Sequence, residues 1–338
     1  MAQVLVTGIT GFIAKHVALE LLKAGHEVRG TVRDLAKGAR TRDSLAAAGG
    51  DIARLGFVEA DLTSDAGWDE AVADCDYVQH LASPLPLKQP RDREALVPAA
   101  VGGVERVVSR ALESGVKRVV QTSSIAAMMY RPGRSRRFTI NENDWTDPEW
   151  KALTAYLVSK TRSERALWAL AASMNATDRV VAVNPGFVLG PPVDGEIGAS
   201  LSAVELLLNG AYPALPPIAF PIVDVRDLAA LHVAAMTVEG VGGRRLLGAG
   251  ETLSMQDMAR TLKADHPDRR VPTAQLPGWL IRLLAGFDGT MRAILPDLDV
   301  WPIADSAYVE ALTGVTFRPA RDAVSAAGAA LMEHGVVK

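Results

Sequence analysis

Three side chains near the middle of the chain are of types that can pass a proton to a carbonyl oxygen: Ser124, Tyr156 and Lys160. Tyr156 and Lys160 are four positions apart, so on a helix they lie on one face. A nearby ammonium favours the phenolate, and Lys160 is therefore expected to lower the tyrosine pKa from its usual ~10 toward neutrality. The pair predicts a general acid, although taken alone it is more typical of an exposed helical pair.

A glycine-containing segment near the start has the pattern of a dinucleotide-binding turn. It reads Thr7-Gly8-Ile9-Thr10-Gly11-Phe12-Ile13-Ala14 and links an apolar run to a helical pattern. This context places backbone N–H groups and the positive end of a helix where a pyrophosphate binds. Gly8 is expected to make the tight turn and Gly11 to let the backbone approach the phosphates. The alternative, an ordinary glycine-rich turn, accounts less well for the position between strand and helix.

The residue after the second apolar run indicates which dinucleotide binds. Sites that prefer NAD carry Asp or Glu there for the ribose 2′-hydroxyl, whereas an arginine accommodates the 2′-phosphate of NADP. Here the run ends at Val32 and Arg33 follows, which favours NADP(H), although the adjacent Asp34 weakens the inference. Three more cations follow in what reads as a loop and could either help or be solvated: Lys37, Arg40 and Arg42.

Asp61 follows the third apolar run and has two compatible interpretations. Its carboxylate could accept a hydrogen bond from the adenine amino group of the cofactor. It could also cap the turn that follows it in the chain.

The elements that must position these residues follow a βαβ pattern around a parallel sheet. The expected strands are Gln3–Thr7, Glu27–Val32, Leu55–Glu59, Tyr77–Leu81, Arg118–Thr122 and Arg179–Asn184. The expected helices are Ile13–Ala24, Gly67–Ala73, Ala95–Ser114 and Thr154–Ala172. The fold class is therefore α/β, a Rossmann-type doubly wound parallel sheet that binds ligands at the carboxyl ends of its strands.

Beyond Asn184, prolines interrupt the chain and the βαβ alternation ends. One more strand is expected at Ile222–Val225, and the expected helices are Ser200–Leu208, Leu228–Met236, Met255–Lys263, Pro277–Ala285 and Asp322–His334. We predict a dinucleotide-binding domain of residues 1–185, to which residues 220–240 return. Residues 186–219 and 241–338 are expected to form a smaller substrate-binding region packed on it.

Composition narrows the classes of function. The 338 residues are 49% hydrophobic and 22% charged, which is enough apolar material for a sizeable core. A net charge of −3 gives no basic footprint for nucleic acid or an anionic membrane. No signal-peptide pattern or membrane-length apolar stretch is present, and the single cysteine excludes an internal disulfide and a zinc site built from cysteines. We expect a soluble, cytoplasmic, metal-free monomer or homodimer acting on a small molecule.

As a set, these motifs resemble the extended short-chain dehydrogenase/reductases of the NAD-dependent epimerase/dehydratase superfamily. The resemblance is to the branch of dihydroflavonol 4-reductase, cinnamoyl-CoA reductase and microbial aldehyde and ketone reductases. The segments that carry it are residues 7–14, 31–34, 80–84, 122–124, 156–160, 184–191 and 223–229.

The resemblance implies reduction of a carbonyl with NADP(H). Ser124, rather than Ser123, would bind the carbonyl oxygen, Tyr156 would deliver its proton, and Lys160 would bind the nicotinamide ribose. Ala100 stands where many family members carry an Asn that supports a proton relay, so the relay route stays open, although the dihydroflavonol reductase branch is similar in lacking that Asn. The residues expected to contact the cofactor are Thr7, Gly8, Thr10, Gly11, Phe12, Ile13, Arg33, Asp61, Leu62, Leu81, Ala82, Ser83, Thr122, Ser123, Tyr156, Lys160, Pro185, Gly186 and Val188.

The expected substrate pocket is mostly apolar and favours a hydrophobic aldehyde or ketone. Its expected residues are Ser83, Pro84, Leu85, Ile125, Met128 and Phe187, of which Met128 could equally be a plain core residue. A nucleotide-sugar epimerase or a hydroxysteroid-type dehydrogenase on the same fold is the alternative enzyme. A non-catalytic NADP(H)-binding regulator is disfavoured, because such proteins tend to lose the tyrosine and lysine, and both are intact here.

Overall fold

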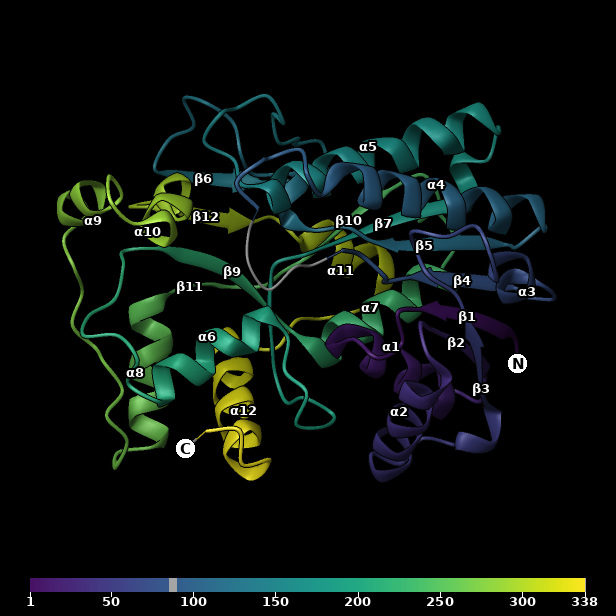
Figure 1. Cartoon of the computed structure of the whole chain (residues 1–338), viewed down its shortest axis with the longest axis horizontal. Helices are drawn as coiled ribbons and strands as arrows, with labels where there is room; N and C mark the ends of the chain where they lie inside the picture. The colour runs from purple at the N-terminus through teal and green to yellow at the C-terminus, as the bar shows by residue number, and fades with distance from the viewer. Residues whose placement is uncertain (85–89, 338) are drawn as a thin grey trace.

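A seven-stranded parallel sheet forms the centre of the molecule in the computed structural model, which describes residues 1–84 and 90–337 (Figure 1). Its strand order is β10-β7-β5-β4-β1-β2-β3. The strands are β1 (Gln3–Thr7), β2 (Glu27–Val32), β3 (Leu55–Glu59), β4 (Tyr77–His80), β5 (Arg118–Thr122), β7 (Val180–Pro185) and β10 (Arg245–Gly248). The order reverses direction at β1, next to β4, so ligands are expected at the carboxyl ends there. The doubly wound α/β fold is confirmed.

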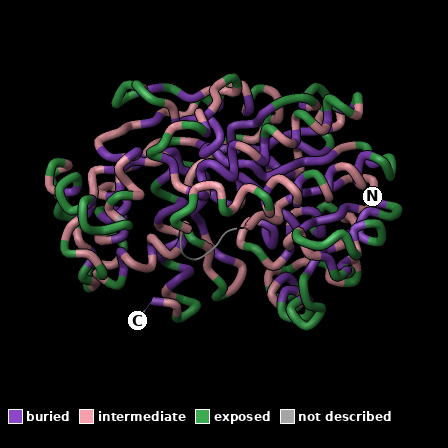
Figure 2. The backbone as a smooth tube through the Cα atoms, turned by 45° about the horizontal axis from the view of Figure 1, so that its top comes forward, coloured by how far each residue is buried: buried purple, intermediate pink, exposed green. Residues whose placement is uncertain are grey.

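Helices cover both faces of this sheet, as the alternation of side chains along β1 requires. Val4 and Val6 point to the face covered by α1 (Phe12–Lys23) and α7 (Val225–Thr237). Leu5 points to the opposite face, covered by α3 (Trp68–Val72), α4 (Val97–Glu113) and α5 (Ala155–Ser173). Burying each such Val or Leu side chain contributes roughly 1.5–3 kcal/mol. Figure 2 shows the buried backbone concentrated along the sheet between these layers.

Two segments depart from the expectations. Residues 35–47, expected to be a loop, form α2 (Leu35–Ala47), whose N-terminus is capped by Asp34 through a 2.9 Å hydrogen bond from Ala36 N. This helix contains few large apolar residues, so the helical repeat of apolar positions is weak in its sequence. Residues 245–248, assigned to the smaller region, instead form β10 and extend the central sheet beside β7.

The second region lies to one side of the sheet in Figure 1 and has its own apolar core. It contains a three-stranded sheet of β8 (Phe187–Leu189), β9 (Ala219–Asp224) and β11 (Thr252–Ser254). It also contributes β12 (Trp301–Ala304), which pairs with β6 (Arg137–Ile140) in a separate two-stranded sheet. The helices of this region are α6 (Ala199–Leu208), α8 (Met255–Asp265), α9 (Gly278–Leu284), α10 (Gly289–Ala293) and α12 (Ala320–Glu333). In contrast, α11 (Ala307–Thr313) packs on α7 and β10 of the central sheet.

Gly186 forms the junction between β7 and β8. A Cβ atom there would lie 2.4 Å from the carbonyl oxygen of Pro221, so β9 could not approach any larger residue. The close approach of the small sheet to the central one therefore depends on glycine at this position.

The single cysteine of the chain is buried. Cys75, between α3 and β4, packs with Trp68, Val72 and Val78, and its burial raises the pKa of the thiol. Among the described residues, no helix combines the length and the hydropathy needed to span a membrane.

Candidate active site

Ser124, Tyr156 and Lys160 lie together at the carboxyl edge of the central sheet. Ser124 follows β5, and its Oγ accepts a 3.1 Å hydrogen bond from Ala126 N at the start of a short 3₁₀ turn. Tyr156, in the first turn of α5, donates from Oη to Ser124 Oγ at 3.5 Å. Lys160 lies one turn further along α5 and is buried.

Burial decides the ionisation of these groups. Burial raises the pKa of Tyr156, and the hydrogen bond with Ser124 acts in the opposite direction. Burial also lowers the pKa of Lys160 to about 8, against the carboxylate of Glu164, which acts to raise it. The expected lowering of the Tyr156 pKa is therefore wrong for this structure, because loss of hydration of the phenolate is the larger effect. Near neutral pH, Tyr156 holds the proton that a general acid must donate.

The glycine turn has the geometry of a phosphate cradle. Gly8 has φ +65°, donates from its N–H to Thr31 Oγ1 at 2.9 Å, and lies so close to Ala82 that a Cβ would be 3.0 Å from the Ala82 Cα. Gly11 is exposed at the N-cap of α1, and no side chain in the described part of the chain caps this helix. Its first N–H groups, from Phe12 and Ile13 onward, are thus available to an anion.

Gly30 of β2 supports this turn and was not among the residues predicted from the sequence. A Cβ at Gly30 would lie 2.5 Å from Cδ1 of Ile9, so only glycine lets the turn rest on the strand. A glycine in the interior of a strand was the available signal.

A charged cavity of about 220 Å³ lies beside the turn, where the 2′-phosphate of a dinucleotide is expected. Arg33 and Lys37 are exposed and line it. The Asp34 carboxylate caps α2 and is not among the residues that line the cavity. The other lining residues are Thr10, Lys15, Arg40, Thr41, Asp194 and Glu196.

Two cations near this cavity differ from the expectations. Arg42 donates to the carbonyl oxygens of Ile52 and Leu55, which turns its guanidinium away from the cavity. Lys15, which the sequence analysis did not consider, is buried in α1 and pairs with Asp194 at 2.5 Å. The position of this lysine within the apolar segment Phe12–Leu22 could have indicated that it is buried and paired.

Polar side chains that follow the strands hold the strand ends together. Thr7 Oγ1 is 2.9 Å from His80 Nδ1 and accepts a hydrogen bond from Ala82 N at 3.0 Å. Thr122 Oγ1 is 3.2 Å from His232 Nε2, and Ser123 Oγ donates to Glu164 at 2.5 Å. The side chains of Thr7, Thr122 and Ser123 therefore have protein partners, and their contacts with a cofactor stay predictions.

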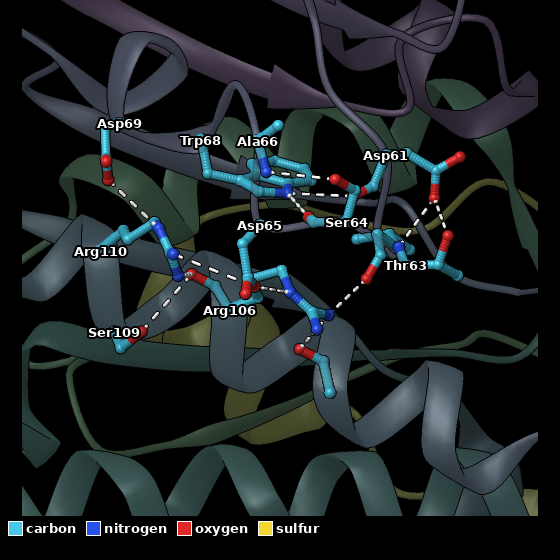
Figure 3. A network of polar contacts seen from close by, with 12 residues as sticks. Asp61, Thr63, Ser64, Asp65, Ala66, Trp68, Asp69, Arg106, Ser109 and Arg110 are labelled. Atoms are coloured by element: carbon cyan, nitrogen blue, oxygen red, sulfur yellow. Dashed lines mark hydrogen bonds and ion pairs between the residues drawn. The ribbon is translucent and has the colours of Figure 1, made fainter.

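Asp61 has the turn-capping role (Figure 3). Its Oδ1 accepts hydrogen bonds from Thr63 N at 2.7 Å and from Thr63 Oγ1 at 2.6 Å, and these bonds lower the pKa of Asp61. Arg106 of α4 donates to the carbonyl oxygen of Leu62 at 2.6 Å and pairs with Asp65. The turn is thus tied to α4, and the contact of Asp61 with adenine stays a prediction.

The expected substrate-pocket residues fall into three groups. Ser83, Pro84 and Phe187 are half-buried, and Phe187 stacks on Phe220 with ring centroids 5.0 Å apart. Ile125 is 9% exposed and follows Ser124, whereas Met128 is fully buried in a core cluster, so it is a core residue rather than a pocket wall. Leu85 lies outside the described residues.

The remaining expected cofactor contacts surround the same edge. Leu81 and Ala82 directly follow β4, and Pro185 ends β7. Val188, in β8, is buried, and Gly186 joins these two strands.

Known proteins are similar to this chain in sequence and fold. Residues 4–246 match the NAD dependent epimerase/dehydratase family. The chain is 35% identical to Cinnamoyl-CoA reductase 1 of Arabidopsis thaliana over 274 residues (80% of this chain, 76% of the relative). It is 31% identical to Ketoreductase azaE of Aspergillus niger over 307 residues (85% and 90%). The crystal structure of yeast methylglyoxal/isovaleraldehyde reductase Gre2, complexed with NADPH, matches with a TM-score of 0.82 at 25% identity, over 99% of this chain and 100% of that one. The chain therefore belongs to the NAD dependent epimerase/dehydratase family, in its extended short-chain dehydrogenase/reductase branch with the cinnamoyl-CoA reductases.

Proposed function

We propose that this protein reduces a hydrophobic aldehyde or ketone with NADPH, and that Tyr156 donates the proton. One observation carries the proposal: the half-buried Tyr156 hydroxyl lies 3.5 Å from Ser124 Oγ and one helical turn from Lys160. Through its family and its reductase relatives, the chain is an NADP(H)-dependent oxidoreductase. The substrate class and the roles of individual residues are our proposals.

In this mechanism, the two hydroxyl groups hold one carbonyl oxygen. Ser124 donates a hydrogen bond to the oxygen, and Tyr156 transfers its proton to the same oxygen while the carbonyl carbon is reduced. The bound nicotinamide supplies the hydride. Lys160, mostly charged below its pKa of about 8, stabilises the phenolate that Tyr156 becomes.

Residues of the first region would hold the cofactor. The uncapped N-terminus of α1 fits the pyrophosphate, because its free N–H groups and helix dipole favour a negative charge. Arg33 and Lys37, on the cavity wall, fit the 2′-phosphate that distinguishes NADPH from NADH.

The apolar character of the substrate side supports a hydrophobic carbonyl compound. Pro84, Ile125 and the stacked pair Phe187 and Phe220 supply apolar surface around the expected position of the substrate. Relatives named as reductases of methylglyoxal, isovaleraldehyde and cinnamoyl-CoA agree with reduction of a carbonyl group.

The test is an NADPH-oxidation screen over aliphatic and aromatic aldehydes, diketones and flavonoid-type ketones, with NADH in parallel. We expect substrate-dependent loss of NADPH absorbance, with apolar substrates preferred over polar ones. An epimerase retains its nicotinamide cofactor and consumes none overall. Conversion of nucleotide sugars without any NADPH oxidation across the panel would therefore overturn the proposal.

A further inference from the structure

A fully buried carboxylate lies directly behind the candidate active site. Glu164, one turn after Lys160 on α5, is 0% exposed. It accepts hydrogen bonds from Ser123 Oγ at 2.5 Å, Asn184 Nδ2 at 2.7 Å and Arg245 Nε at 2.5 Å. These donors follow or belong to β5, β7 and β10, so one side chain joins three neighbouring strands of the sheet to the helix of Tyr156.

Arg245, the ionic partner of Glu164, is also buried and fully engaged. Its guanidinium lies 3.8 Å from the ring centroid of Trp145. Its Nη1 donates to the carbonyl oxygens of Glu142, at 3.0 Å, and of Asp144. A buried ion pair rarely adds net stability, because desolvation offsets the attraction between the charges. Net stabilisation is therefore a weak explanation for this ion pair, and its contacts indicate another role.

The contacts of Glu164 connect α5, the helix of Tyr156 and Lys160, to the backbone of Ser124. Asn184, held by Glu164, also donates from Nδ2 to the carbonyl oxygen of Ser124 at 3.1 Å. Ser123, the other neighbour of Glu164, precedes Ser124 in the chain. The backbone of Ser124 is thus fixed relative to α5, which carries both Tyr156 and Lys160.

The charge of Glu164 acts on Lys160. Burial lowers the pKa of Lys160, and the carboxylate of Glu164 is the charge that opposes this effect. Lys160 also faces His80 of β4, which is neutral because burial lowers its pKa to about 3. Tyr156 is protonated, and Ser123, Asn184 and Trp168 face Glu164 as neutral donors. Arg245 is the cation that pairs with the Glu164 carboxylate, at 2.5 Å.

We propose that Glu164 and Arg245 are positioning residues: their ion pair fixes Ser124 beside Tyr156 and keeps Lys160 positively charged during the reaction. The proposal rests on the proposed reductase function for its catalytic meaning. The charge of Lys160, however, can be measured without any substrate.

The test compares Glu164→Gln, Arg245→Gln and Arg245→Lys with the wild type. Titration of the Lys160 side-chain resonance by NMR, assigned with a Lys160→Arg variant, gives its pKa directly. We expect the pKa to fall by about one unit in Glu164→Gln, which loses the negative charge, and to change little in Arg245→Lys, which keeps the ion pair. The basic limb of the kcat profile of Glu164→Gln should move down in pH by the same amount, with kcat at about pH 8 reduced on the order of tenfold and the KM of the substrate changed less. Arg245→Gln removes the cation that holds Glu164 in the network around Ser124 and should lower kcat as well.

Arg244→Gln is the matched control. Arg244 is the exposed neighbour of Arg245 and contacts Glu142 only at 3.5 Å, so its loss should leave the pKa of Lys160 and the kcat profile unchanged. Unchanged profiles in Glu164→Gln and Arg245→Gln would overturn the proposal, as would the failure of both variants to fold, because the pair would then serve the fold alone. A shifted Lys160 pKa in a protein that oxidises no NADPH would instead retain the pair's effect and refute the reductase function.

Discussion

The hydroxyl of Tyr156 is the one group of the site that must both keep and release a proton. Tyr156→Phe should lower kcat by about 10²–10⁴-fold, because it removes the general acid and leaves the phenyl ring in place. NADPH affinity, measured by fluorescence titration, should change little. Tyr77→Phe removes a hydroxyl from β4 and should preserve turnover. Near-normal turnover in Tyr156→Phe would assign the proton to another group.

Arg33 should decide between the two dinucleotides. Arg33→Ala should raise the Kd of NADPH by roughly tenfold or more and change that of NADH little, since a charge-assisted phosphate contact contributes about 1.5–3 kcal/mol. Arg42→Ala is the control, because its guanidinium binds backbone carbonyls and not the cavity. An equal loss for both dinucleotides in Arg33→Ala would contradict a phosphate role.

At this scale, the sequence predicted residues that belong to a spaced pattern and missed those that act through contacts between distant segments. Ser124 and Tyr156 could be paired because Ser124 follows a recognisable strand and Tyr156 lies at the start of a recognisable helix. Glu164 and Arg245 are 81 positions apart, and only the fold brings them together. The sign of the Tyr156 pKa shift also depends on burial, which spacing does not report.

Among the elements, the loop after β8 is held against the cofactor-binding half. Asp194 pairs with Lys15 of α1 at 2.5 Å and accepts a hydrogen bond from Ser44 of α2 at 2.8 Å. Asp194 also lines the charged cavity, so its negative charge should oppose a bound 2′-phosphate.

Asp194→Asn should therefore strengthen NADPH binding several-fold relative to NADH, because the cavity loses a negative charge and Lys15 loses its ionic partner. Calorimetric titration with both dinucleotides measures the ratio. Glu20→Gln, which breaks an exposed pair on α1, is the control and should not alter it. Weaker NADPH binding in Asp194→Asn would show that the loop contact matters more than the charge.

The elements that the sequence predicted well are those with strong burial. Four of the strands expected in the first half have the observed bounds, because a strand buried on both faces is a continuous apolar run between polar turns. β8 and β11 span three residues each, too few for a period to show. The helix α2 was missed because it presents mostly polar residues to solvent.

For the molecule as a whole, buried histidines set the response of stability to acid. Burial lowers the pKa of His80 and His232 to about 3, and that of His16 to about 4. In the unfolded chain these groups take up protons near the usual ~6.5, whereas in the folded protein they do not. Their contribution is thus complete above about pH 6.5 and is lost as the pH falls toward about 4 for His16 and about 3 for His80 and His232.

The free energy of unfolding, measured with urea, should consequently decrease below about pH 6.5 by up to ~1.4 kcal/mol per pH unit for each of these histidines. His232→Gln should reduce this slope by the contribution of one histidine, up to ~1.4 kcal/mol per pH unit. Replacing the exposed His334 with Gln is the control. A slope unchanged by His232→Gln would contradict its neutral state in the folded protein.

The single cysteine, Cys75, makes local opening of the folded protein measurable by thiol labelling. Thiol reagents attack the thiolate, so burial and a raised pKa make Cys75 unreactive while the protein is folded. Because the chain has no second cysteine, any incorporated dye must report on the seam between α3 and β4. The rate of labelling under native conditions therefore measures how often that one seam separates, without an engineered probe.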